Sequence, residues 1–155
     1  MATLIADRAK ASFPVSKFSG AGILSVAYGA YTLAANPTAA DIVQFCRLPA
    51  GAVVLGGYLR GEDIDSGTET LDIDIGWAAN GVEAADPDGF GNFGVITGDV
   101  ITEWKTEVSI FMPLNGVLKS GPVTFTNETI IQGVVNAAAQ AGGTGVIWLQ
   151  VWYTV

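Results

Sequence analysis

The sequence Val146-Ile-Trp-Leu-Gln-Val-Trp-Tyr-Thr-Val155 alternates between two sets of side chains. In an extended chain, successive side chains point to opposite faces, so each set occupies one face. The set that is entirely apolar or aromatic consists of Ile147, Leu149, Val151, Tyr153 and Val155. A period of two is typical of a half-buried β-strand. We therefore expect residues 145–155 to form a strand with a complete core face.

Other stretches of strand length precede this one and are separated by turns rich in Gly, Pro, Asp and Asn. They span residues 23–33, 42–48, 52–60, 68–77, 95–104, 108–112, 123–126 and 129–135. The clearest is 68–77, in which Leu71, Ile73, Ile75 and Trp77 are predicted to point inward while Thr70, Asp72, Asp74 and Gly76 point to solvent. The predicted fold class is all-β, an antiparallel β-sandwich with a jelly-roll-like arrangement over residues 19–155.

The first 18 residues show neither a helical nor an alternating period, and Pro14 interrupts them. They predict an extended N-terminal arm that a partner fixes in place and that contributes little to the fold of the body. The arm is slightly basic, because Arg8, Lys10 and Lys17 outnumber Asp7. We expect Arg8, Lys10, Phe13 and Lys17 to contact the partner.

Composition restricts the classes of function. The 155 residues suit one domain, and although 50% are hydrophobic, no run approaches the roughly 20 apolar residues of a membrane span. A net charge of −8 with only 7 Lys and Arg argues against nucleic-acid binding. Residues 61–103 hold 11 acids and no base, which predicts a solvated acidic surface. With no histidine to activate a nucleophile, Cys46 is expected to be a buried hydrophobe and the chain not an enzyme.

The segment Gly89-Phe-Gly-Asn-Phe-Gly94 has the letters of a dinucleotide-binding loop but lies in a turn-rich stretch instead of a βαβ unit. Two alternatives stay open for Phe90 and Phe93. They dock on a neighbouring chain, or they pack over the end of their own sandwich.

Clusters of acidic residues could form a cation site or a catalytic pair. Oxygen ligands for calcium are present at Glu62, Asp63 and Asp65, and again at Asp86 and Asp88. A glycosidase pair is conceivable between Asp72 or Asp74 and Glu103. Turn-forming Asp residues and outward strand acids explain these positions more simply, so we expect no metal and no cofactor.

The four tryptophans raise the question of a sugar-stacking platform. Trp77 belongs to the inward set of its strand, whereas Trp148 and Trp152 share the face opposite the apolar one. That face either covers a second layer or meets another subunit, and we take Trp148 and Trp152 as candidate interface residues.

The segment Asp41–Leu59 (DIVQFCRLPAGAVVLGGYL), followed by the strand 68–77 and the terminal strand, resembles head decoration, or cement, proteins of tailed bacteriophages. The likeness rests on Arg47-Leu-Pro-Ala-Gly51 followed by an apolar strand, and it extends over most of residues 20–155.

This resemblance implies a virion component without enzymatic activity that is made in the host cytoplasm. It would bind the major capsid protein on the outside of the lattice, stabilise the capsid, and assemble as a homotrimer. A carbohydrate- or receptor-binding module of a phage tail or cell surface is the alternative, and it predicts exposed aromatic residues and sugar affinity.

Overall fold

The computed structural model describes residues 2–12, 23–62, 64–65, 70–91, 112–113, 121–141 and 144–155. Within these residues the chain forms strands and a single 3-10 turn, η1, but no α-helix. The elements are β1 (Thr3–Ile5), η1 (Asp7–Ala9), β2 (Ser25–Leu33), β3 (Ile42–Leu48), β4 (Val53–Gly61), β5 (Asp72–Trp77), β6 (Asp86–Gly91), β7 (Met112–Pro113), β8 (Val123–Thr124), β9 (Thr129–Ala137) and β10 (Gly145–Thr154). The predicted strand 95–104 and most of 108–112 lie outside the described residues.

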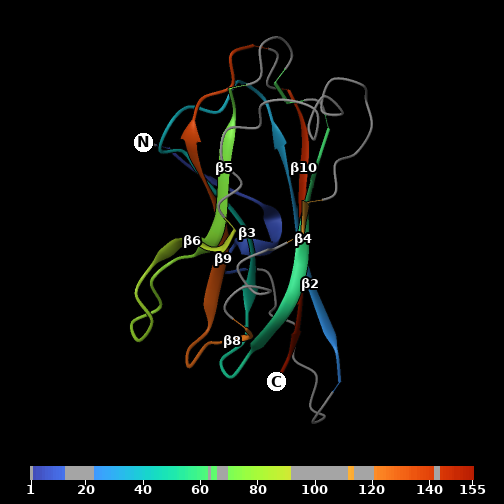
Figure 1. Cartoon of the computed structure of the whole chain (residues 1–155), viewed down its shortest axis with the longest axis vertical. Coiled ribbons are helices and arrows are strands. Elements are labelled where there is room, and N and C mark those ends of the chain that lie inside the picture. The colour runs from blue at the N-terminus through green and yellow to red at the C-terminus, as the bar shows by residue number, and fades with distance from the viewer. Residues whose placement is uncertain are drawn as a thin grey trace.

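The strands form two sheets packed face to face (Figure 1). One, the β9 sheet, has the order β1-β3-β9-β5-β6, and the other, the β10 sheet, has the order β2-β10-β4-β7 with β8 also paired to β4. Apart from the parallel pair β1 and β3, the described pairings are antiparallel. The predicted all-β sandwich is thus confirmed, whereas its jelly-roll arrangement stays a prediction.

The core between the two sheets is apolar, and β10 contributes to it as its alternation predicts. Ile147, Leu149, Val151 and Tyr153 are each exposed by 1% or less. Val155 departs from the expectation, since it is 48% exposed. Strand β10 and its ladder to β4 both end at Thr154, so Val155 lies past the end of the strand. Cys46 is buried in the core, as expected of a small hydrophobe.

Strand β5 confirms its predicted core face but corrects its predicted solvent face. Ile73 and Ile75 are buried, and the Trp77 side chain packs at the edge of the core. Asp74, however, is only 5% exposed, and its Oδ2 accepts a hydrogen bond from Asn136 Nδ2 at 2.5 Å. The irregular register between β5 and β9 lies next to Asp72 and Ile73, close to Asn136. An alternating pattern cannot reveal such a bulge, so it predicts a wet face where a buried polar contact forms.

The segment predicted as a turn-rich loop contains strand β6, which pairs with β5. Close approach explains its glycines. A Cβ atom on Gly89 would lie 2.2 Å from the Trp77 ring, and one on Gly76 would lie 1.9 Å from the Asp86 carbonyl oxygen. Glycine therefore lets the two strands and the tryptophan ring lie against one another.

The N-terminal segment also differs from the expectation. Strand β1 adds to the edge of the β9 sheet, where the Ala6 amide donates to the Gln44 carbonyl oxygen at 2.8 Å. Ala6 and Ala9 are buried, and η1 packs against β2 and β3. The described part of the arm is therefore built into the body. The predicted boundary at residue 18 and any contact with a partner stay predictions.

The two sheets are in close contact where β2 passes β3. A Cβ atom on Gly29 would lie 1.9 Å from the Phe45 carbonyl oxygen. Only glycine permits this contact, which brings the edge of the β10 sheet against the β9 sheet. In the described part of the chain, no helix has the length and apolarity needed to cross a membrane.

Candidate interaction surface

The outer face of the β10 sheet carries the aromatic side chains that β10 directs away from the core. Trp148 is half-buried, and Trp152 is 36% exposed. Both residues lie on the face that the alternation assigned to them. Neighbouring strands add further side chains to this face, and we call the whole the outer face.

The register of β2, β10 and β4 arranges the outer face in rows. One row runs from Tyr28 on β2 through Gln150 on β10 to Tyr58 on β4. The next row contains Ala30, Trp148 and Arg60, in the same strand order. Neighbouring strands are about 4.8 Å apart, so each row spans about 10 Å.

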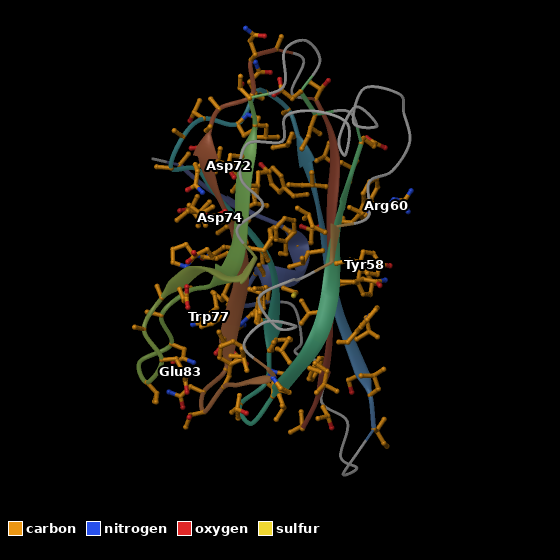
Figure 2. The ribbon with its side chains drawn as sticks, viewed as in Figure 1. Tyr58, Arg60, Asp72, Asp74, Trp77 and Glu83 are labelled. Carbon is orange, nitrogen blue, oxygen red and sulfur yellow. The ribbon has the colours of Figure 1, made fainter. Side chains whose placement is uncertain are left out.

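Two ring contacts hold this arrangement. The Tyr58 and Trp152 rings meet edge to face, with centroids 6.1 Å apart. The guanidinium carbon of Arg60 lies 4.9 Å from the centre of the Trp148 ring, a cation–π contact. Figure 2 shows Tyr58 and Arg60 projecting from β4 on the side away from the core. The rings are therefore fixed by their neighbours as well as by their strands.

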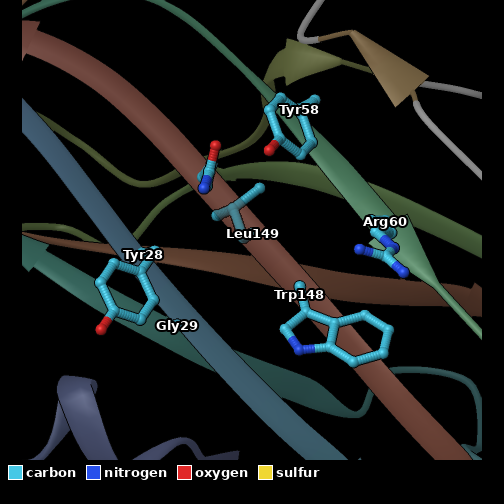
Figure 3. A pocket seen from close by; sticks show the side chains of 7 residues that line it. Tyr28, Gly29, Tyr58, Arg60, Trp148 and Leu149 are labelled. Carbon is cyan, nitrogen blue, oxygen red and sulfur yellow. The ribbon is translucent and has the colours of Figure 1, made fainter. Parts of the chain in front are cut away.

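Between these rings the outer face is hollowed. A shallow depression of about 100 Å³ is lined by Tyr28, Gly29, Tyr58, Arg60, Trp148, Leu149 and Gln150. In Figure 3 Tyr28 stands on one side of β10, Tyr58 and Arg60 stand on the other, and Trp148 lies between them. We call this feature the aromatic depression. Because Leu149 is fully buried, its side chain belongs to the core, beneath the outer face.

Beyond the depression, toward the start of β2 and the end of β10, the exposed side chains become apolar. Leu24 is 57% exposed, Val26 46% and Leu55 43%. Val26 lies directly across from Trp152 in the ladder between β2 and β10. We call Leu24, Val26, Leu55 and Trp152 the apolar end of the outer face. Exposed apolar residues that gather in this way mark interaction sites more often than scattered ones do.

The glycine-rich segment contains two of the candidate interface residues, Phe90 and Phe93, and the structure describes only the first. Phe90 is fully buried and packs against Trp77 and Phe125, with ring centroids 5.0 and 6.2 Å away. Of the two alternatives, Phe90 follows the second, packing over the end of its own sandwich, so its expected contact with a partner is wrong. Phe93 lies outside the described residues.

The basic arm residues are only partly described. Lys10 is exposed and its Nζ lies 2.5 Å from an Asp7 carboxylate oxygen. Arg8 falls within η1, and Phe13 and Lys17 lie outside the described residues. A partner contact through these four residues stays a prediction.

Asp65, in the first predicted acidic cluster, serves the fold. It is 3% exposed, and its Oδ2 accepts hydrogen bonds from the backbone amides of Thr70 and Leu71 at 2.7 and 2.9 Å. Its Oδ1 accepts one from the amide of Gln140 at 2.9 Å. The carboxylate thus joins the segments before β5 and after β9 through hydrogen bonds to residues that are not its immediate neighbours in the sequence.

Two other acids of the predicted clusters, Asp72 and Asp86, have shifted pKa values but do not form a ligand cluster. Burial raises the pKa of Asp72, and burial together with the neighbouring Asp88 raises the pKa of Asp86. Among the described residues no three Asp, Glu or Cys side chains gather as metal ligands. Asp63 and Glu103 lie outside that part of the chain, so the proposed pair with Glu103 stays untested.

Sequence reasoning missed four residues of the aromatic depression, Tyr28, Tyr58, Arg60 and Gln150. Each lies in a stretch that the sequence correctly predicts to be a strand. The missing information was the register that places them side by side.

No family model matches the sequence, and no curated protein matches it. The chain shares its fold with chains of phage capsids. A chain of the capsid of Ralstonia phage GP4 is similar over 98% of this chain and 97% of its own length, with a TM-score of 0.63 and 21% identity.

Two further structures show the same likeness. A chain of the cyanophage Pam1 capsid asymmetric unit matches over 94% of this chain and 93% of its own, with a TM-score of 0.60 and 23% identity. A chain of the acidic stable capsid of Helicobacter pylori bacteriophage KHP30 matches over 86% and 89%, with a TM-score of 0.56 and 15% identity. At these identities, the likeness shows a common fold.

Proposed function

We propose that this chain is a structural, non-enzymatic component of a phage virion that binds the outside of the capsid lattice and stabilises it. The observation that carries the proposal is the fold, which matches chains from three phage capsids over 86% to 98% of this chain. The Arg47–Gly51 motif and the strand after it supply the more specific resemblance to decoration proteins. The proposed partner is the major capsid protein, and the proposed assembly on the lattice is a trimer.

The apolar end of the outer face supports this role as a contact surface. Trp152 is an exposed side chain of the kind that dominates binding energy once a partner excludes water from it, and Leu55 adds exposed apolar area at the same end. A protein that binds the assembled shell and not its loose subunits stabilises the shell by mass action. The acidic body keeps the rest of the surface solvated.

The test is addition of the purified chain to capsids assembled without it. We expect electron microscopy to show added protrusions on the shell, and heating to show a higher disassembly temperature for the decorated shell. Bare capsids carried through the same steps are the control. Absence of added density contradicts the proposal, and so does formation of closed shells by this chain alone, because that result would make it the shell protein.

A further inference from the structure

We propose that the aromatic depression binds a pyranose ring of a polysaccharide, an activity that goes beyond attachment to a capsid. Its lining consists of flat groups, namely three aromatic rings, one guanidinium and one amide, over a floor of strand backbone. A pyranose offers an apolar face of C–H groups and a rim of hydroxyl groups. Such a ligand needs flat apolar surfaces with hydrogen-bonding groups at their edges.

The rows of the sheet provide that combination in a fixed geometry. Tyr28 and Tyr58 flank Gln150 in one row, so two rings stand on either side of a side-chain amide. An amide both donates and accepts hydrogen bonds, as pyranose hydroxyls require. The adjacent row places Ala30 next to Trp148, and this small residue leaves open the space beside the tryptophan.

The aromatic depression is preformed, so its shape does not depend on a ligand. Continuous antiparallel ladders join β10 to β2 and to β4 through both rows. Arg60 lies over the Trp148 ring, which fixes the tryptophan on the side toward β4. Binding therefore orders few side chains, and the entropy cost of forming the complex is reduced.

The size and the lining of the aromatic depression favour a sugar over a protein segment as its ligand. The volume of about 100 Å³ is below the roughly 300 Å³ at which pockets enclose a whole small ligand. The depression therefore binds one sugar ring through one of its sides and leaves the rest of the ring exposed. The exposed aliphatic side chains that suit a protein partner, such as Val26 and Leu55, lie at the apolar end and do not line the depression. A single partly enclosed ring gives weak binding for each copy of the chain.

The test uses the isolated full chain and saturation-transfer NMR with the methyl pyranosides of glucose, galactose, mannose, rhamnose, N-acetylglucosamine and glucuronic acid. We expect transfer to at least one of these sugars. Glucuronic acid distinguishes an acidic ligand from the neutral ones. If none of the six receives saturation, the proposal is overturned.

Two substitutions on one strand locate the site. Tyr28 and Val26 lie on the same face of β2 and are exposed to nearly the same extent, 47% and 46%, but only Tyr28 lines the depression. Tyr28→Ala should weaken binding of the responding sugar about tenfold, because it removes a stacking surface. Val26→Ala should leave the affinity unchanged, and Tyr28→Phe should retain most of it because the ring remains.

Circular dichroism verifies that each variant is folded. Retention of wild-type affinity by folded Tyr28→Ala overturns the proposal, as does an equal loss in Val26→Ala. The isolated chain is used without capsids, so failure here leaves the capsid role standing. Failure of capsid addition likewise leaves sugar binding standing.

Discussion

Three aromatic rings close one end of the core and show how single residues hold the two sheets together. Trp77 on β5 lies 5.0 Å from Phe90 on β6 and 5.3 Å from Phe125, measured between ring centroids. Both phenylalanines are fully buried, while the Trp77 indole N–H donates to the Ala84 carbonyl oxygen at 3.0 Å. Tilted and edge-to-face rings add stability beyond the area that they bury.

Phe90→Ala should destabilise the protein by about 3–5 kcal/mol, because the substitution leaves a cavity beside Trp77 and Phe125. Urea unfolding followed by tryptophan fluorescence measures the change. Val82→Ala, at a residue that is 60% exposed, is the control and should change stability by less than about 0.5 kcal/mol. Equal midpoints for wild type and Phe90→Ala would show that the phenylalanine does not pack as described.

Glu83 makes stability depend on acid pH. The Thr126 amide donates to its Oε1 at 2.9 Å and Asn80 Nδ2 donates to its Oε2, and these hydrogen bonds lower the pKa of Glu83 from 4.5 to about 2. A carboxyl group whose pKa is lower in the folded state stabilises the fold fully above its unfolded pKa. This contribution is lost as the pH falls from about 4.5 through about 2.

We therefore expect Glu83→Gln to have a lower thermal midpoint than wild type at pH 7 and the difference to shrink between pH 4.5 and pH 2. Melting followed by circular dichroism across this pH range provides the measurement. A difference that stays constant with pH would mean that the charged form of Glu83 is not the stabilising one.

Among the elements, β1 is the one whose role departs most from its sequence pattern. It has three residues, yet the chain that follows it buries Ala6, just before η1, and Ala9, within η1. Asp41 joins the start of the chain to the turn before β3. Its Oδ1 accepts a hydrogen bond from the Ala2 amide at 3.2 Å, and its Oδ2 accepts one from the Thr38 amide at 2.9 Å. The N-terminal segment is thus held by backbone hydrogen bonds to β3 and by a hydrogen bond to the Asp41 side chain.

Deletion of residues 2–12 should lower the stability of the body by about 2 kcal/mol or more, since buried alanines and ladder hydrogen bonds are lost. For a chain of this size, that is about 4–8 °C in the melting temperature. Lys10→Ala, which removes only an exposed ion pair, should melt like wild type. An unchanged melting temperature after the deletion would instead support the prediction from the sequence, in which the arm contributes little to the fold of the body.

The sequence predicts well those strands whose alternation or apolar runs are long. The predicted strand 42–48 has the observed bounds of β3, and β10 differs from its prediction by one residue. Strand β6 is missed because its Asp, Pro and Gly residues have little strand propensity, and β1 is missed because three residues are too few to show an alternation. Both are held by neighbours distant in the sequence. The aromatic depression is missed for a related reason, because pairing of Gln150 with both Tyr28 and Tyr58 depends on register.

On the scale of the whole molecule, the two sides of the sandwich differ in chemistry. The described strand residues on the outer face of β2, β10 and β4 include Arg60 but no carboxylate, whereas Asp72, Asp74, Asp86 and Asp88 lie on β5 and β6 of the other sheet. With a net charge of −8, the chain repels copies of itself except where acids are absent. Among the described surfaces, the outer face is therefore the one best suited to association.

Trp152→Asp should weaken association of the chain with itself or with the capsid by at least about tenfold, because it places an unpaired charge in the contact. Analytical ultracentrifugation and capsid binding measure the two cases. Val82→Asp, at an exposed apolar residue on the opposite sheet's loop, is the control for the added charge. Normal assembly by a folded Trp152→Asp variant would exclude the apolar end as the interface.

The contact between Gly29 and the Phe45 carbonyl oxygen limits how this sequence can evolve. Any side chain at position 29 would begin with an atom 1.9 Å from that oxygen, so no replacement fits unless the two sheets move apart. In a library randomised at positions 28–30 and selected for folded protein, we expect glycine alone to survive at 29. Exposed Ala30, one residue away, should accept many replacements. Descendants of this chain can therefore change the ligand preference of the face beside β2 while the residue beneath it stays fixed.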